Sequence, residues 1–225
     1  MEQQKNIWYV TILLTTIAGY CDTVTFVAAD SIFSAHVTGN FIVFAYQIIK
    51  GSDLHAWVKL LTFPIFITSV IIGGWIAARS SYKYELLLWE GIVLTSSGVA
   101  AYMFSFFGVF TTWPIYLIAM MVVFAMGLQN AFGKLYSKET HGPTTMMTGN
   151  VTQASLDLGN LIKTRFKDLD IKLSFKKQFV TICGFMVGCF LGAVAGKNWG
   201  LGTVLLPGIG MIICYVKNRH ITATV

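Results

Sequence analysis

Two identical Thr-Gly-Asn triplets stand 110 positions apart in this sequence, each in an apolar setting. Threonine and asparagine favour helix starts, and glycine and asparagine interrupt helices, so each triplet predicts a helix that begins inside an apolar layer. The N–H groups at such a start make a weakly positive pocket. Two such pockets facing one another would form a polar site, suited to an anion or to a neutral solute that forms hydrogen bonds. The predicted site therefore contains Thr38, Gly39, Asn40, Thr148, Gly149 and Asn150.

A second pair of matching segments lies just upstream of the triplets. Gly19-Tyr20-Cys21-Asp22 aligns with Gly127-Leu128-Gln129-Asn130. Asp22 falls deep in the first apolar run, where a carboxylate is costly unless it is paired, hydrated or protonated. Its partner in the alignment, Asn130, is neutral and similar in shape. This asymmetry fits one titrating coupling group beside a pseudo-symmetric pocket, although a carboxylate near the outer interface that simply reaches water is the alternative.

Other polar residues are candidates for gating or for lining the site. His36 and His141 precede the two triplets and could act as proton-sensitive gates, or be ordinary solvated loop residues. Glu90 lies about one turn inside its span, where its side chain could reach the interface. Asp157 is expected at the rim of the site. Gln129 and Gln153 are expected to offer hydrogen bonds to a solute. The competing interpretation of both triplets is a tight helix contact with asparagine as interhelical glue.

The composition is that of a membrane protein. Of the 225 residues, 55% are hydrophobic and only 12% charged, with a mean hydropathy of +0.67. The apolar residues form runs near the length that crosses a bilayer, so 1–225 is interpreted as one polytopic all-α membrane domain. The four cysteines lack metal-ligand spacing, and no catalytic or nucleotide-binding motif is found, so neither an enzyme nor a cofactor or metal is predicted. The basic residues cluster in short loops, which favours membrane topology over nucleic-acid binding.

Six spans and two weaker segments can be drawn. The spans are about 7–29, 60–78, 85–105, 113–132, 178–196 and 199–216, and the weaker segments, 33–49 and 145–162, contain the triplets. If the weak segments re-enter rather than cross, 13 Lys and Arg residues face inward and 3 outward; if they cross, the counts are 11 and 5. The positive-inside rule favours the first arrangement, with both termini cytoplasmic. Repeats 7–105 and 113–216 then have three spans each and are inverted, whereas four spans each would make them parallel.

Two further features concern packing and lipid. Residues 163–177 are basic, and the apolar positions 162, 166, 169 and 173 recur at helical spacing, which predicts an amphipathic helix on the inner leaflet, held by anionic lipid. A glycine at every fourth position predicts a close helix contact, within the chain or in a homodimer. These glycines are Gly184, Gly188, Gly192 and Gly196.

The motifs in their order resemble a known family. Gly19-Tyr20-Cys21-Asp22, His36-Val37-Thr38-Gly39-Asn40, Gly127-Leu128-Gln129-Asn130-Ala131 and Met147-Thr148-Gly149-Asn150 are similar to the YoaK-type family, whose domain has no assigned function. The resemblance extends over nearly the whole chain. It implies a small, multi-pass protein of the bacterial inner membrane and supplies no chemistry. An analogy to aquaporin-like channels rests only on asparagines near re-entrant helix starts, because the Asn-Pro-Ala motif is absent.

The residues predict a membrane transporter of a small solute, with its site between the two triplets. An anion is one candidate solute, and Asp22 is the expected proton- or cation-coupling group. A passive channel for a small neutral solute or anion is the first alternative. A non-transport role, in lipid binding or as a scaffold, is the second. The three are separated by Asp22→Asn, which a channel tolerates, and by replacement of Asn40 and Asn150, which in a scaffold changes stability alone.

Overall fold

The computed structural model describes residues 2–51, 55–109 and 111–223, and every regular element in these ranges is a helix. The helices are α1 (Glu2–Ala28), α2 (Gly39–Lys50), α3 (Val58–Arg79), α4 (Glu85–Phe106), α5 (Thr112–Leu135), η1 (Ser137–Glu139), α6 (Met147–Lys163), α7 (Leu169–Trp199), η2 (Gly200–Val204) and α8 (Leu205–Ala223).

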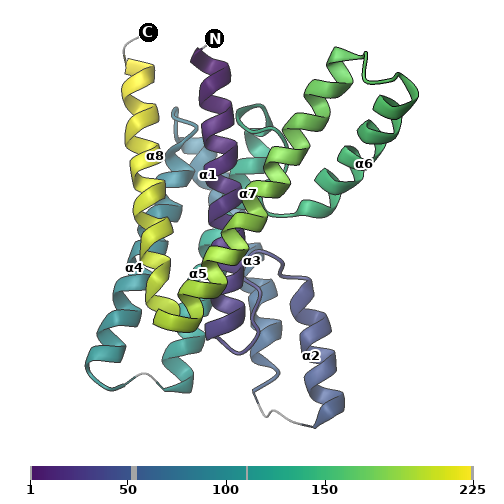
Figure 1. Cartoon of the computed structure of the whole chain (residues 1–225). Helices are drawn as coiled ribbons and strands as arrows, with labels where there is room; N and C mark the ends of the chain where they lie inside the picture. Colours follow the sequence, from purple (N-terminus) through teal and green to yellow (C-terminus); the bar gives the residue numbers. More distant parts are fainter. Residues whose placement is uncertain (1, 52–54, 110, 224–225) are drawn as a thin grey trace.

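Six long helices of the described chain form the bundle, and both chain ends lie at the same end of it (Figure 1). Five stretches of the described chain are apolar and long enough to cross a membrane, the last of them containing α7, η2 and α8 together. The predicted spans coincide with α1, α3, α4, α5, α7 and α8, apart from shifts at their ends. The prediction of an all-α, multi-pass membrane protein is therefore confirmed.

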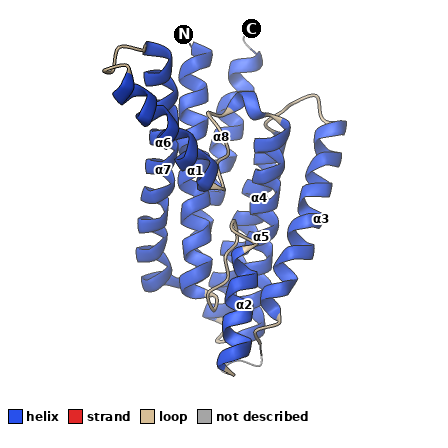
Figure 2. Ribbon diagram, turned by 90° about the vertical axis from the view of Figure 1, so that its right-hand side faces the viewer, coloured by secondary structure: helices blue, strands red, loops and turns tan. Residues whose placement is uncertain are grey.

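The short helices α2 and α6 occupy opposite ends of the bundle (Figure 2). After α1, the chain turns back toward the middle of the bundle, and α2 then runs to the end remote from the termini (Figure 1). After α5, the chain also turns back, and α6 then runs to the end that holds the termini. The turn after α1 contains Asp30 and Ser31, both with positive φ, near 52° and 58°.

Helices α1 and α5 supply much of the buried core, whereas α3 and α7 expose much of their length. The α5 side chains Ile118, Val122 and Met126 are fully buried. Exposed apolar side chains follow the outer faces of α3 and α7, including Ile67, Ile71, Trp75, Met186, Phe190 and Val194. So large an apolar surface is unusual for a soluble monomer and is what a lipid-facing helix requires.

The glycine spacing in α7 makes a close contact with α1, as the sequence predicts for a packing seam. A Cβ atom on Gly188 would lie 2.1 Å from the carbonyl oxygen of Thr16, and one on Gly192 would lie 2.5 Å from that of Tyr20. Gly184 and Gly196 also face α1. Since α1 of the same chain covers this face, the four glycines are not free to form the homodimer contact that the spacing also suggested.

The prediction of one amphipathic helix over residues 163–177 is wrong, because a turn separates two helices there. Helix α6 ends at Lys163, the chain turns through Arg165 and Phe166 with positive φ, and α7 begins at Leu169. The Asp168 side chain accepts hydrogen bonds from the backbone N–H groups of Asp170 and Ile171 and so caps α7. The apolar spacing that suggested one helix runs across this turn. Its side chains remain exposed, namely Ile162, Phe166, Leu169 and Leu173.

Candidate functional site

Asp22 is the only carboxylate of α1 whose surroundings the structure describes, and it holds the returning chain in place. It lies six residues before the last residue of α1 and is 5% exposed. Its Oδ1 accepts hydrogen bonds from the backbone N–H of Ala35 at 2.7 Å and of His36 at 3.3 Å. Charge-assisted bonds of this kind stabilise a carboxylate that has little contact with water. The backbone at 35–36 is therefore fixed beside the last third of α1.

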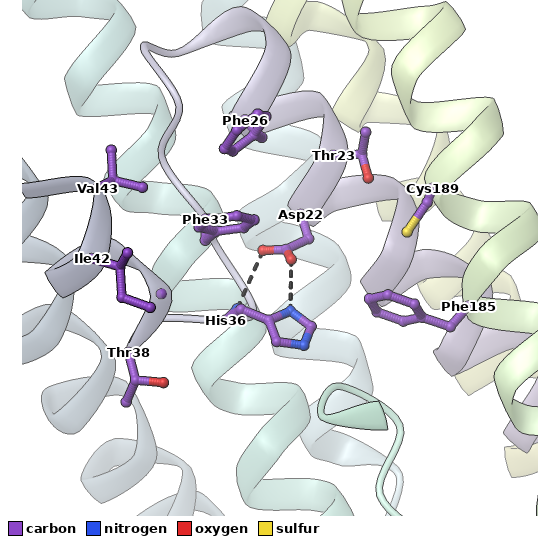
Figure 3. Close-up of a pocket in the computed structure, with 11 residues that line it drawn as sticks. Asp22, Thr23, Phe26, Phe33, His36, Thr38, Ile42, Val43, Phe185 and Cys189 are labelled. Carbon is purple, nitrogen blue, oxygen red and sulfur yellow. Dashed lines mark hydrogen bonds and ion pairs between the residues drawn. The ribbon is translucent and has the colours of Figure 1, made fainter. Parts of the chain in front are cut away.

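His36 completes the arrangement by pairing with the same carboxylate. Its Nδ1 lies 2.7 Å from Oδ2 of Asp22, and its side chain is 35% exposed (Figure 3). Figure 3 also shows the second ring nitrogen turned away from Asp22. An imidazole held by a carboxylate at one nitrogen and open at the other can exchange a proton or bind a solute.

The Asp22–His36 pair lines a cavity of about 670 Å³. Helices α1, α2 and α7 and the chain segment between α1 and α2 form its walls. The polar lining is Asp22, Thr23, His36 and Thr38, and the rest is mostly apolar, comprising Phe26, Phe33, Gly39, Ile42, Val43, Phe185 and Cys189. A largely apolar cavity with a few convergent polar groups has the character of a small-molecule site.

Asn40 fixes the wall of this cavity formed by residues 33–38. Its Oδ1 accepts from the backbone N–H of Phe33 at 2.8 Å, and its Nδ2 donates to the Phe33 carbonyl, also at 2.8 Å. The same Nδ2 donates to the Thr62 hydroxyl of α3 at 3.0 Å. Asn40 is fully buried, and these bonds give its amide oxygen and nitrogen the partners that a buried polar group needs. The same bonds link the loop, α2 and α3.

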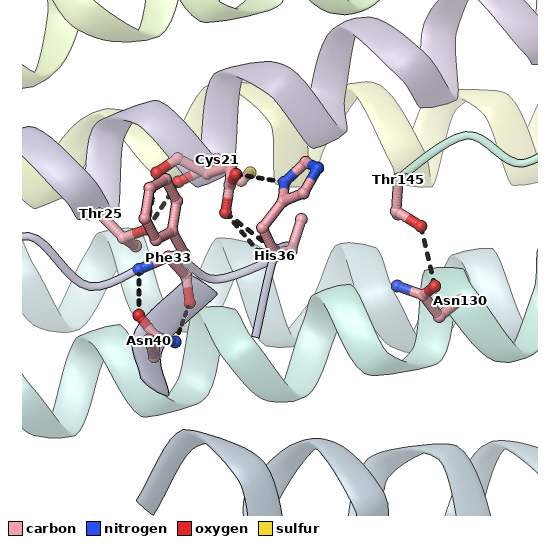
Figure 4. A network of polar contacts seen from close by, with 9 residues as sticks. Cys21, Thr25, Phe33, His36, Asn40, Asn130 and Thr145 are labelled. Carbon is pink, nitrogen blue, oxygen red and sulfur yellow. Dashed lines mark hydrogen bonds and ion pairs between the residues drawn. The ribbon is translucent and has the colours of Figure 1, made fainter. Parts of the chain in front are cut away.

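The second triplet repeats part of this arrangement. Nδ2 of Asn150 donates to the carbonyl of Pro143 at 2.8 Å. Pro143 has no N–H, so the reciprocal bond made by Phe33 has no equivalent here. Upstream, Asn130 accepts a 2.8 Å hydrogen bond from the Thr145 hydroxyl (Figure 4). This contact corresponds, in the second half, to the contact of Asp22 with Ala35 and His36 in the first. The second half thus has a neutral version of the contact made by Asp22.

The structure divides the predicted site residues into separate groups. Thr38 and Gly39 of the first triplet line the cavity with Asp22 and His36, whereas Asn130 and Asn150 bond the chain segment between α5 and α6. Within the described residues, α2 and α6 do not contact one another. Gln129 lies in the core instead of lining an open pocket, because its Nε2 donates to the Leu14 carbonyl at 2.9 Å and to the Thr144 hydroxyl at 3.0 Å.

The remaining predicted residues occupy other places. Gln153 donates to Asp157 at 2.8 Å, and Asp157 accepts from the Ser174 hydroxyl at 2.6 Å, so this pair joins α6 to α7. Thr148 and Gly149 are exposed. Glu90 does not reach an interface, because it is fully buried on α4.

His141 lies in a different, polar hollow of about 550 Å³ near the start of α7. Burial and the nearby charge of Lys177 lower the pKa of His141, which favours its neutral form. Its ring packs against Trp8, with centroids 4.3 Å apart. His141 and His36 therefore do not form a common gate.

Two features of the structure were not predicted from sequence. The cavity wall from α7, Phe185 and Cys189, lies in a uniformly apolar run that gives no positional signal. A polar cluster at the end remote from the termini joins Asp30, Lys59 and Tyr116, in which the fully buried Lys59 pairs with Asp30. A lysine at the start of an apolar helix was the available signal for this cluster. Among the described residues, no group of three or more His, Cys, Asp or Glu side chains is placed to hold a metal ion.

The long apolar helices and the buried polar turns define a multi-pass helical membrane protein. The family model for a protein of unknown function, DUF1275, matches residues 10–216, and the chain belongs to this family. It is also similar to the UPF0700 transmembrane protein YoaK of Bacillus subtilis (strain 168), with 25% identity over 200 residues, which cover 86% of this chain and 80% of that protein. The predicted family resemblance is confirmed. No solved structure matches the chain.

Proposed function

We propose that this protein transports a small solute across the membrane and that the cavity lined by Asp22 and His36 binds that solute. The observation that carries the proposal is a carboxylate–imidazole pair lining a cavity at the point where the chain turns back beside α1. Ionisable side chains within membrane-spanning bundles are costly and mark pathways for solutes or protons.

The arrangement of the helices supports two inverted repeats, 7–105 and 113–216. Helices α1 and α5 run in opposite directions, and α2 and α6 leave the middle of the bundle toward opposite ends (Figure 1). The packing is also reciprocal, because α1 packs against α7 and α5 packs against α3. Inverted repeats with interrupted helices are the architecture by which many transporters expose one site alternately to the two sides. The triplet segments would then be re-entrant.

The cavity favours a solute with an apolar body and one polar group. Phe26, Phe33 and Phe185 supply aromatic surface, and the polar groups gather at Asp22 and His36. The start of α2 lines the same cavity, but the backbone N–H groups of Gly39, Asn40 and Phe41 already donate to carbonyls of residues 36–38 and so offer little to a negative group. The Asp22 carboxylate opposes an anion, so an anionic solute is compatible only while His36 is positively charged or Asp22 is protonated.

Asp22 is suited to couple proton binding to movement of the segment 33–38. Its carboxylate accepts two backbone bonds and holds His36, and protonation would weaken all three interactions together. The segment would then be free to rearrange around the cavity. The second half has Asn130 and Thr145 at the matching place, a contact that does not respond to protons. One half of the bundle would move, and the other would serve as its fixed counterpart.

The charges support an orientation with both termini in the cytoplasm of a bacterial cell. The loops and helix ends near the termini hold most of the basic residues, from Arg79 and Lys83 to Lys217 and Arg219, whereas Lys50, Lys59 and Lys197 belong to the remote end. By the positive-inside rule, the termini face inward. The exposed apolar and basic side chains of the α6–α7 turn would then rest on the anionic inner leaflet of the plasma membrane.

The first experiment is a thermal-stability screen of the purified protein against small anions, amino acids, nucleobases, polyols and cations. A compound that stabilises the wild type and not Ile42→Trp, which enlarges one side chain of the cavity lining, identifies the solute class and places it there. Flux of that compound is then measured in proteoliposomes with an imposed pH gradient. A proton-coupled carrier loses accumulation in Asp22→Asn, whereas a passive channel keeps its flux. Absence of any stabilising compound and of any flux would reject transport and favour a lipid-binding or scaffold role.

A further inference from the structure

The cavity beside Asp22 and His36 has a one-sided charge balance. Among the described residues that line it, Asp22 is the one acidic and His36 the one basic side chain, and lysine and arginine are absent. With Asp22 as a carboxylate, the lining is negative while His36 is neutral and balanced while His36 is protonated. The N–H groups at the start of α2 are bonded within the chain and add no donor. An anion therefore finds no net attraction there.

Aromatic rings follow one another beside this carboxylate. The ring centroids of Phe26 and Phe33 are 4.7 Å apart, those of Phe33 and His36 are 6.4 Å apart, and those of His36 and Phe185 are 5.6 Å apart. Figure 3 shows these rings grouped around the Asp22–His36 pair. The face of an aromatic ring carries partial negative charge and attracts a cation. The rings and the carboxylate thus favour the same sign of charge.

The first triplet sets the position of the Phe33 ring. Asn40 bonds both the backbone N–H and the carbonyl of Phe33. A Cβ atom on Gly39 would lie 3.1 Å from Cδ2 of the Phe33 ring, so the glycine leaves the space that the ring occupies. The triplet therefore holds an aromatic side chain in the wall of the cavity.

The second half closes its turn without either feature. The residue seven positions before Asn150 is Pro143, which has no aromatic ring, and the counterpart of Asp22 is the neutral Asn130. A turn of this kind thus closes without a carboxylate and without phenylalanine. The two groups that attract a cation are therefore additions to the first half beyond what its turn requires.

We propose that the solute of this cavity is an organic cation, with its positive charge near Asp22 and its apolar body against Phe26, Phe33 and Phe185. The assignment rests on the proposed transport function and names its substrate class. The ring faces and the carboxylate attract the charge together, and the rings also cover the apolar body. His36 is neutral in the complex, because a second positive charge in the same cavity would repel the solute.

Calorimetric titration of the purified protein with three probes of one shape tests this inference. At neutral pH, 2-phenylethylammonium is a cation, 2-phenylethanol is neutral and phenylacetate is an anion. The cation is expected to bind about ten-fold more tightly than the alcohol, and phenylacetate is expected to bind most weakly. Equal affinities, a preference for the alcohol or for phenylacetate, or no binding of the cation would overturn the proposal.

Variants of the lining place the cation in the cavity. Phe33→Leu keeps an apolar side chain but removes the ring, so it should weaken binding of the cation by about three-fold or more and that of the alcohol by less. Phe63→Leu is the matched control, because Phe63 packs against Phe41 on the exposed side of α3 and does not line the cavity. Asp22→Asn should remove the preference for the cation over the alcohol. Phe185→Leu replaces any variant that does not fold.

Unchanged selectivity in the folded variants would show that the cation binds elsewhere and would reject the site. Binding and transport are measured separately. Selective binding of the cation without flux in proteoliposomes rejects transport and leaves the cation site standing. Flux of phenylethanol or phenylacetate, with no binding of phenylethylammonium, retains transport and rejects the cation site.

Discussion

The side chain of Asn40 donates to the carbonyl of Phe33 at 2.8 Å, and Asn150, 110 positions later, donates to that of Pro143 at the same distance. In both cases the bond reaches seven residues upstream and closes the turn before a short helix. The two contacts differ in one respect, since Phe33 also donates its N–H to Asn40, and proline has no N–H to donate. The first turn is consequently held more firmly than the second.

This difference leads to a prediction about stability. Asn40→Ala leaves the N–H and the carbonyl of Phe33 without their partner and should lower the free energy of unfolding by about 1–3 kcal/mol. Asn150→Ala removes one bond to the Pro143 carbonyl and a longer one to the Met147 sulfur, and should cost less. Thermal unfolding in detergent measures both, with Asn198→Ala as the exposed control. If Asn150→Ala proves the more damaging variant, the contact pattern does not govern stability in these turns.

The directions of α2 and α6 predict which ends of these helices can be labelled from each side of the membrane. In a functional cysteine-free background, Lys50→Cys should react with an impermeant maleimide applied outside intact cells. Arg165→Cys should react only after the membrane is opened, because α6 ends on the side of the termini. Arg219→Cys serves as the control for that side. Labelling of both Lys50→Cys and Arg165→Cys from the same side would contradict the inverted arrangement and favour eight complete crossings.

The contact of α7 with α1 predicts a position that does not accept even one methyl group. In Gly188→Ala the new Cβ would meet the Thr16 carbonyl, so the two helices must separate, at a cost of about 1–3 kcal/mol. Gly74→Ala is the matched control, because no neighbouring atom lies within 4 Å of the position that its new methyl group would occupy on α3. Replacement there should be neutral or stabilise the helix by up to about 1 kcal/mol. Equal melting temperatures for the two variants would show that the α1–α7 contact yields easily.

Much of the fold follows from the sequence because the membrane imposes simple lengths. Runs of about 20 apolar residues identify the long helices. The triplets identify the short ones, since α2 begins at Gly39 and α6 at Met147, next to or within each triplet. The amphipathic pattern at 163–177 misled because helical spacing by itself does not reveal a turn. Positive φ at Arg165 and Phe166 reverses the chain there, and neither residue type signals such a turn.

The site was less accessible to sequence reasoning. Asp22 and His36 are candidates from their positions alone, but their 2.7 Å contact depends on how far the chain turns back along α1. The expected single site between the triplets remains a prediction, and the structure shows each asparagine bound to its own turn. Phe185 enters the cavity from a helix far along the chain, and periodicity cannot show which face of α7 meets α1. Tertiary packing decides the Asp22–His36 contact, the turn that each asparagine binds and the face of α7 that meets α1.

The glycine contact also bears on how the chain is made. Gly19 in α1 packs closely against the backbone of Phe185 and Cys189 in α7, which are synthesised more than 160 positions later. At ordinary translation rates the interval is on the order of ten seconds or more. During this time α1 carries Asp22 into the bilayer without the neighbour that finally covers it. The packing of α1 in the first half therefore depends on a helix of the second half, and it is completed only after α7 has been synthesised.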